Sequence, residues 1–338
     1  MTGTSPITGT SAGDRHPLLT TGTPAGDRHL SHHPHLSHHP RLSHHPHLSP
    51  PPTEGGPPVE AVSRTAQWTA AARALETERE DRLFADPYAR TVADEIGFEL
   101  LKRYDGGGIV PFLAIRTTYL DRAITAAVEE RGIRQVVFLA AGMDTRFHRL
   151  PWPDGTTVYE LDRPALLEAK AELLKGEPRP AGRTRVAVPV DLTQDWTGAL
   201  EEAGWKSDEP VLWVVEGLLF FLPEQAVRTL IATLSAHAAP GSVLLGDVIS
   251  RAALVNPLAR GFMKALEEDG NPWLFGTEDP EGLLADCGWA VREVRQPGED
   301  GADFERWPYP VPDRAVPGVP RSFLFTCDLP TISQEVAA

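Results

Sequence analysis

Five apolar runs, separated by segments with helical spacing of apolar residues, dominate the chain after residue 134. They are strand candidates at 135–141, 157–162, 185–191, 211–216 and 242–248. Strands that alternate with helices predict an α/β fold with a parallel sheet, and nearly continuous apolar runs predict strands covered on both faces. Two further candidate strands, 290–296 and 322–328, lie on either side of a proline-rich connection. The pattern therefore predicts seven strands.

Helical patterns precede the sheet. Residues 65–76 consist of good helix formers and predict a first helix. Asp86-Pro87 marks a break before a second helix that begins near Tyr88. Apolar residues recur at near-helical spacing over 112–130 and predict a third helix. We therefore predict an N-terminal helical cap at 59–133. The core is predicted at 134–330, followed by a tail at 331–338. An apolar, partly helical insertion at 251–282 either covers a substrate pocket or is a peripheral packing element.

The first 58 residues differ from the rest. Ten of the twelve histidines lie before Pro50, in an approximate hexamer repeated three times with a proline in each copy. Such a segment has too few large apolar side chains to offset the loss of chain entropy, so 1–58 is predicted to be a disordered leader. Its imidazoles could bind metal loosely, but no fixed ligand geometry is encoded. No metal site is predicted, and a metal-storage protein built on this segment is a minor alternative.

Composition narrows the class of protein. The net charge of −15 argues against a nucleic-acid partner, because such a surface must neutralise phosphates. The N-terminus lacks the features of a secretion signal, and no run of about 18 apolar residues could span a bilayer, so no membrane partner is expected. Cys287 and Cys327 have no partner motif and are predicted to be buried, reduced thiols. A cytoplasmic enzyme is the expectation.

The most informative motif is the end of the first strand, where an apolar run leads into Ala140-Ala141-Gly142. An acid, Asp162, follows 20 residues after the glycine, at the end of the second strand. This arrangement is how a doubly wound sheet binds the ribose of a nucleoside. The G-x-G-x-x-G sequence that approaches a pyrophosphate is missing, which favours S-adenosylmethionine over a dinucleotide. A nicotinamide-dependent oxidoreductase remains a weaker alternative.

Polar residues stand at or just past the ends of four successive strands. They are Gly142, Asp162, Asp191 and Glu216. Ligands of open α/β sheets bind outside the carboxyl ends of the strands, so these residues are expected to meet at one rim. Each alone could be a cap or a solvated loop acid, whereas four in succession favour a binding site.

Each of these acids suits a different part of the cofactor. Asp162 can accept both ribose hydroxyls, because a carboxylate offers two acceptor oxygens. Asp191 can accept from the adenine amino group, with the Leu192 amide available to a ring nitrogen. Glu216 can balance the ammonium of the methionine part. Arg116, on the preceding helix, is the candidate for the methionine carboxylate, since a guanidinium binds a carboxylate bidentately.

Seven ordered motifs resemble those of the leucine carboxyl methyltransferase-like family, which includes bacterial polyketide-type O-methyltransferases and actinobacterial paralogues. They are Ala72–Glu76 (ARALE), Leu83–Tyr88 (LFADPY), Ile115–Asp121 (IRTTYLD), Ala141–Arg146 (AGMDTR), Tyr159–Pro164 (YELDRP), Val190–Leu192 (VDL) and Val215–Leu219 (VEGLL). The resemblance covers about 61–330. It implies a class I S-adenosylmethionine-dependent methyltransferase, with a Rossmann-like, seven-stranded, mostly parallel sheet closed by an antiparallel hairpin, and an N-terminal helical cap.

The same resemblance implies cofactor roles for specific residues. These are Arg116, Gly142, Asp162, Asp191, Leu192 and Glu216, with Arg73 where the family often places a basic residue near the methionine carboxylate. It fixes neither the methyl acceptor nor the oligomeric state.

The expected reaction is O-methylation of a carboxylate, on a small secondary metabolite or a peptide C-terminus. A carboxylate is ionised at neutral pH and needs no general base, and the globular part has only two histidines, His148 and His237, both expected to be structural. No catalytic residue is assigned. A hydroxyl acceptor would need a base, for which His148 is the first candidate. A cofactor-binding regulator without activity is a further alternative.

Overall fold

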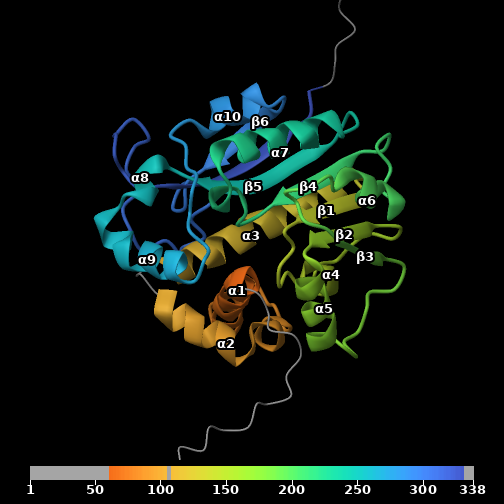
Figure 1. Ribbon diagram of the computed structural model, residues 1–338, viewed down its shortest axis with the longest axis horizontal. Helices are drawn as coiled ribbons and strands as arrows, with labels where there is room; N and C mark the ends of the chain where they lie inside the picture. The colour runs from red at the N-terminus through yellow and green to blue at the C-terminus, as the bar shows by residue number, and fades with distance from the viewer. Residues whose placement is uncertain (1–60, 105–107, 331–338) are drawn as a thin grey trace, which may run out of the picture. The chain divides into compact units, whose positions relative to one another are not determined.

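The computed structural model describes residues 61–104 and 108–330 (Figure 1). The predicted leader 1–58 and tail 331–338 lie outside the described residues, so their predictions stay predictions. Three helices come first: α1 (Ala61–Thr77), α2 (Ala89–Tyr104) and α3 (Ile109–Glu129). They confirm that helices precede the sheet, although the first begins four residues earlier than its pattern predicts.

A close crossing joins α1 to α2. Gly97 of α2 makes it possible, because a Cβ there would lie 2.5 Å from the carbonyl oxygen of Gln67. Trp68 of α1 packs edge to face on Tyr104 of α2, with ring centroids 5.7 Å apart. The two helices therefore form a firmly packed pair, and α1 also packs on α3.

Seven strands form one sheet in the order β3-β2-β1-β4-β5-β7-β6, in which all neighbours are parallel except those of β7. The strands are β1 (Gln135–Leu139), β2 (Thr157–Asp162), β3 (Thr184–Pro189), β4 (Val211–Val215), β5 (Val243–Ile249), β6 (Ala290–Arg295) and β7 (Ser322–Asp328). The predicted strand count, the mostly parallel sheet and the antiparallel hairpin at its end are confirmed. The chain order turns back between β3 and β4, so the carboxyl ends of β1 and β4 meet at the switch point.

Helices cover both faces of the sheet (Figure 1). They are α4 (Arg146–Arg149), α5 (Pro164–Leu173), α6 (Thr197–Glu202), α7 (Glu224–Ala236), α8 (Arg251–Leu254), α9 (Arg260–Glu268) and α10 (Pro280–Asp286), with 3-10 turns at Leu219–Phe221 and Pro257–Ala259. Alternate residues of β1 enter different cores: Val136 and Phe138 pack with residues of α3, whereas Val137 and Leu139 pack with residues of α7. The apolar runs are thus explained by burial on two faces.

The prediction of two-sided burial is wrong for β3. Its residues are mostly exposed or half-buried, and only Val188 is fully buried. The reason is its place in the sheet, because β3 is an edge strand that pairs only with β2. Strand order depends on long-range pairing, which the local pattern does not encode.

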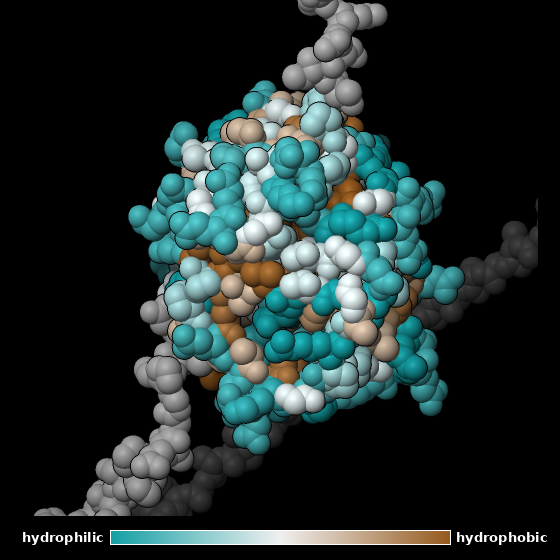
Figure 2. Space-filling view, turned by 90° about the vertical axis from the view of Figure 1, so that its right-hand side faces the viewer, coloured by the Kyte–Doolittle hydropathy of each residue, from teal (hydrophilic) through white to brown (hydrophobic). Residues whose placement is uncertain are grey.

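The face of the molecule seen in Figure 2 is mainly hydrophilic, with hydrophobic surface limited to small patches. Within 61–104 and 108–330, no helix combines the length and apolar character needed to cross a bilayer.

Candidate functional site

A cavity of about 450 Å³ opens at the carboxyl ends of β1, β2 and β4, under α1 and the first turns of α3. Such a volume is typical of small-molecule sites. Its lining includes all seven residues that the sequence singles out, namely Arg73, Arg116, Gly142, Asp162, Asp191, Leu192 and Glu216. Residues up to 143 positions apart in the sequence therefore meet around one space.

The β1 turn and the β2 acid are bonded to each other. The Gly142 amide donates to Asp162 Oδ2 at 2.8 Å, and the Arg163 amide donates to Oδ1 at 2.8 Å. Only 7% of Asp162 is exposed, and burial raises its pKa although the two amide bonds oppose the shift. The carboxylate is thus held at the cavity wall by backbone donors, while each oxygen keeps a second lone pair for a ligand.

A Gly142→Ala substitution is expected to weaken ligand binding about tenfold and to lower the free energy of unfolding by about 1–2 kcal/mol. Gly142 has a φ of +48°, and a Cβ there would lie 3.0 Å from the Cβ of Ala66. The matched control is Gly132→Ala, because Gly132 has a φ of +71° but nothing within 4 Å of its missing Cβ. Thermal unfolding and calorimetry with S-adenosylhomocysteine measure both effects. Equal ligand binding by the two variants would contradict the expectation.

The end of β3 contributes an exposed acid. Asp191 Oδ1 accepts from the amide of Thr193 at 2.9 Å and from its hydroxyl at 2.8 Å, and these bonds lower the pKa of Asp191. Leu192 follows in the same turn and is half-buried. Asp191 therefore stays ionised, with its second oxygen available at the open side of the cavity.

Glu216, just past β4, lies between two arginines. Its Oε1 is 3.0 Å from Arg116 Nε, and its Oε2 accepts from Arg146 Nη1 at 2.6 Å. Burial alone would raise the pKa of Glu216, but the charges of Arg146 and Arg116 lower it below its usual range. Glu216 is thus a fixed anion at the cavity floor, with 16% of its side chain exposed.

The pairing of Arg116 with Glu216 was not predicted, since the two residues were given separate partners on a ligand. Arg116 also donates to Asp247 Oδ2 at 3.1 Å, while Asp247 Oδ1 accepts from the Gly217 amide at 2.6 Å. Arg116 is 5% exposed and Asp247 is fully buried. Their contact locks the first half of α3 to β5 and to the turn after β4.

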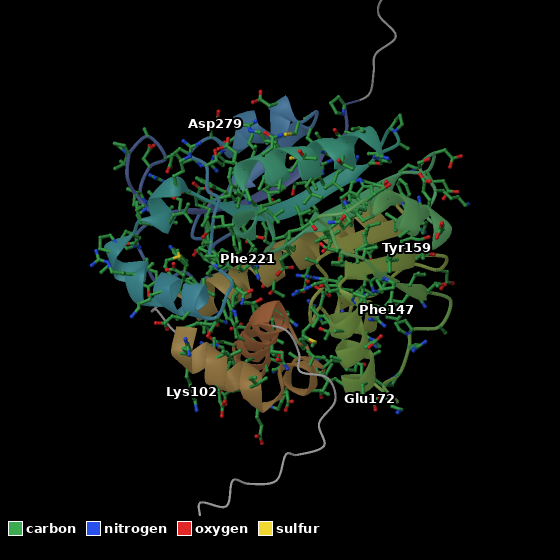
Figure 3. All side chains as sticks on the ribbon, viewed as in Figure 1. Lys102, Phe147, Tyr159, Glu172, Phe221 and Asp279 are labelled. Atoms are coloured by element: carbon green, nitrogen blue, oxygen red, sulfur yellow. The ribbon has the colours of Figure 1, made fainter. Side chains whose placement is uncertain are left out.

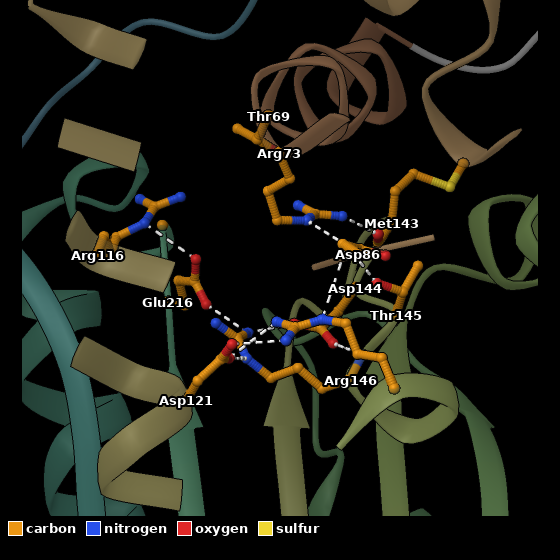
Figure 4. A network of polar contacts seen from close by, with 12 residues as sticks. Thr69, Arg73, Asp86, Arg116, Asp121, Met143, Asp144, Thr145, Arg146 and Glu216 are labelled. Carbon is orange, nitrogen blue, oxygen red and sulfur yellow. Dashed lines mark hydrogen bonds and ion pairs between the residues drawn. The ribbon is translucent and has the colours of Figure 1, made fainter. Parts of the chain in front are cut away.

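Arg146, at the start of α4, is the centre of a buried ion network (Figure 4). Its Nε donates to Asp121 at 2.6 Å, and its Nη1 contacts both Glu216 and Asp144. Burial would raise the pKa of Asp144, but Arg146 and other nearby cations lower it to about 2. One guanidinium therefore joins α3, the β1 turn and the end of β4.

The network continues toward α1. Arg149 bonds Asp121 through both terminal nitrogens and lies 3.7 Å from Asp86. Asp86 accepts from Arg73 Nε at 3.0 Å, and Arg73 Nη2 donates to the Met143 carbonyl at 2.6 Å (Figure 4). Arg73 thereby fastens α1 to the β1 turn while it lines the cavity.

Several members of this network lie within the sequence motifs, but the motifs by themselves predict no role for them in the site. They are Asp86, Asp121, Asp144 and Arg146, while Asp247 was noted only as part of a strand. The signal in the sequence is that charged residues stand beside apolar ones in these motifs, as in LFADPY and in the strand that holds Asp247. A charged side chain that is buried without a partner destabilises the fold, so charged residues at buried positions have to pair with one another.

The other end of the cavity is apolar. Its lining includes Trp68 of α1, Phe112 of α3, Phe220 and Phe221 of the turn after β4, and Trp273. Trp273 belongs to the 251–282 insertion, so one residue of that segment reaches the cavity while Val255 and Leu258 are 79% and 90% exposed. The alternative that the insertion contributes to a pocket is supported for Trp273, whereas no residue of α8 is among the described lining residues.

Neither histidine of the described residues lines the cavity. His148 bonds the Pro178 carbonyl at 3.1 Å, and His237 bonds the Thr233 carbonyl at 2.9 Å. Burial lowers the pKa of His148. Among the described lining residues there is no histidine, cysteine, lysine or tyrosine. No cluster of metal-ligating side chains occurs within 61–104 and 108–330.

The fold and the cavity define the class of protein. A sheet with order 3-2-1-4-5-7-6, an antiparallel seventh strand and a cavity at the switch point form a class I methyltransferase fold. Two solved structures show the same fold. A DUF574 family protein of Streptomyces avermitilis has a TM-score of 0.54 and 12% identity, and the match covers 79% of this chain and 97% of that one. A provisionally named methyltransferase of Thermobifida fusca has a TM-score of 0.51 and 17% identity, and the match covers 79% of this chain and 94% of that one.

Sequence comparison gives the family. The leucine carboxyl methyltransferase model matches residues 66–235, half of the chain. A Mycobacteroides abscessus protein with the provisional name S-adenosyl-L-methionine-dependent methyltransferase is 39% identical over 250 residues, 68% of this chain and 83% of that protein. A Mycobacterium avium protein with the same name is 41% identical over 207 residues, 56% and 66% of the two chains. This chain belongs to the leucine carboxyl methyltransferase family of S-adenosylmethionine-dependent methyltransferases.

Proposed function

We propose that this protein methylates a carboxylate oxygen of a small acid or a peptide C-terminus and so forms a methyl ester. The observation that carries the proposal is the lining of the cavity. It holds fixed acids at the strand ends, and its described residues include no histidine, cysteine, lysine or tyrosine that could act as a general base. The cofactor supplies an activated methyl group, so the protein has to position the acceptor and exclude water.

The residues present fit the cofactor. We expect Asp162 to bind the ribose hydroxyls. Its carboxylate is buried and held in place by two backbone amides, and each oxygen keeps a lone pair that can accept from a ligand. Asp191 and the Leu192 amide are to bind the adenine edge. We expect Glu216 to accept from the ammonium group of the cofactor's methionine part. Arg116 and Arg73 are expected to bind the carboxylate of that part.

The charge of the network supports a cationic ligand. Four arginines (Arg73, Arg116, Arg146 and Arg149) face five acids (Asp86, Asp121, Asp144, Glu216 and Asp247), which leaves a formal charge of −1. S-adenosylmethionine carries a net positive charge through its sulfonium. A slightly negative floor therefore favours its binding electrostatically.

The lining also supports a carboxylate acceptor. A phenol or an alcohol must lose a proton, and a good base has a pKa near neutrality. The pKa values of Asp144, Asp191 and Glu216 are lowered. Burial raises the pKa of Asp162, but the remaining lone pairs of this carboxylate are assigned to the ribose hydroxyls rather than to the acceptor. A carboxylate is ionised and nucleophilic without such help.

The test combines binding and turnover. Calorimetry with S-adenosylhomocysteine should show stoichiometric binding, and labelled methyl donor with a panel of carboxylic acids should give products that release methanol in alkali. Binding with products stable to alkali would favour hydroxyl methylation, and binding without any product would favour a non-catalytic regulator. No binding would overturn the proposal.

A His148→Ala variant is expected to keep full methyl-transfer activity, within about twofold, because His148 lies outside the cavity lining and bonds a backbone carbonyl. The pH profile of turnover between pH 6 and 8 should be unchanged as well. A selective loss of turnover with retained cofactor affinity would instead identify His148 as the base of a hydroxyl methyltransferase.

A further inference from the structure

An aromatic wall closes the apolar end of the cavity. Trp273 packs on Phe220 with ring centroids 4.5 Å apart and lies 6.4 Å from Phe221. Behind it, Phe262 of α9 packs edge to face on Trp273 at 5.0 Å and on Trp68 at 6.4 Å. Figure 3 shows Phe221 toward the middle of the molecule. Rings from α1, the β4 turn and the insertion thus form one connected surface.

Backbone hydrogen bonds hold this wall in place. The amides of Leu274 and Phe275 donate to the Phe220 carbonyl at 2.6 and 3.3 Å, and the Thr277 amide donates to the Ile249 carbonyl at 2.8 Å. The segment that carries Trp273 is therefore fastened to the turn that carries Phe220. A rigid ring surface costs little conformational entropy when a ligand packs on it.

The chemistry of the wall differs from that of the polar end. Besides the aromatic rings, the apolar lining of the cavity includes Ile109, Leu113, Leu218 and Leu222, and α1 adds Thr65 and Thr69 to the lining. Among the charged lining residues, Arg116 lies over the Phe112 ring, with its Cζ 5.5 Å from the ring centroid, and it is paired with Glu216 and Asp247. Arg73 is paired with Asp86. A peptide would bring several amide groups here with few partners, which is unfavourable in a buried site.

We infer that the methyl acceptor carries a flat, apolar ring system, which packs on the wall formed by Trp68, Phe112, Phe220, Phe221 and Trp273 while its carboxylate points toward the polar end. The inference rests on the proposed function and selects a ring-bearing acid over a peptide C-terminus. Offset stacking and edge-to-face contacts favour rings over flexible chains of equal size.

The experiment compares three series of acceptors with the full-length protein: benzoic, naphthoic and anthracene carboxylic acids, unbranched alkanoic acids of the same carbon numbers, and tripeptides with a free C-terminus. We expect kcat/KM to rise with ring number and to exceed that of the matched alkanoic acids and of the peptides by about tenfold. Higher activity on peptides or on alkanoic acids would overturn the inference.

Variants of the wall supply the second measurement. Trp273→Ala should lower kcat/KM for ring-bearing acids about tenfold through KM, whereas Trp273→Phe should restore most of the loss. Leu274→Ala is the matched control, because Leu274 is 50% exposed in the same segment and does not line the cavity. Unchanged KM in Trp273→Ala, or equal losses for all acids, would contradict the inference. Absent S-adenosylhomocysteine binding in the wild type would instead contradict the proposed function.

Discussion

An Asp162→Asn variant is expected to bind S-adenosylhomocysteine about 100-fold more weakly than the wild type. Both carboxylate oxygens of Asp162 accept backbone amides, from Gly142 and from Arg163. An asparagine would turn an amide donor toward one of these N–H groups, so the β1 turn would lose a bond at the place where the ribose is proposed to lie. Calorimetry measures the effect directly.

Asp191→Asn is the control for this substitution. Asp191 is exposed and only one of its oxygens is bonded by Thr193, so the loss of affinity is expected to be about tenfold or less. Circular dichroism should show that both variants are folded. Comparable losses in the two variants, or an unchanged affinity in Asp162→Asn, would contradict the assignment of Asp162 to the ribose.

An Arg146→Met variant is expected to lose about 3–5 kcal/mol of the free energy of unfolding. Arg146 is 2% exposed and is bonded by three acids, Asp121, Asp144 and Glu216. Methionine would leave these largely buried carboxylates, whose side chains are 13–16% exposed, without their common cation. Cofactor affinity should fall as well, because Glu216 loses the partner that fixes its Oε2.

The loss should depend on pH with a defined sign. In the wild type the pKa of Asp144 is lowered to about 2 from 3.8, so its contribution to stability is present above pH 4 and disappears as the pH falls toward 2. The difference between wild type and Arg146→Met should therefore shrink over that interval in denaturant titrations.

Two further variants test whether the loss of stability in Arg146→Met comes from the buried ion network. Arg146→Lys retains the charge but not the fork of donors, and it should recover part of the stability. Arg103→Met removes a guanidinium that is 44% exposed and paired with Glu268 and Asp269 at the surface, so it should cost about 1 kcal/mol or less. Equal losses for Arg103→Met and Arg146→Met would show that the buried network does not stabilise the fold.

The strand boundaries show how far local patterns reach. The second and seventh strands were predicted to the residue, at 157–162 and 322–328, and the other five differ by one or two residues. The error at β3 has another origin, because its apolar residues Val186 and Val188 suggest a buried strand. Only the order of the sheet, which places β3 at the edge, explains its exposure.

The sequence by itself determined that strand ends carry Gly142, Asp162, Asp191 and Glu216, because the carboxyl ends of parallel strands share one edge of a sheet. It also determined the family, since seven ordered motifs agree with it. These are properties of local pattern and chain order.

Only the tertiary structure decided which groups pair. Arg116 meets Glu216 across 100 positions, and Arg146 joins Asp121, Asp144 and Glu216. Likewise, Trp273 reaches Phe220 only through the packing of the insertion on the turn after β4. Ion pairing and ring packing depend on distances of a few ångströms between elements, and these distances follow from how helices and strands pack rather than from the spacing of residues along the chain.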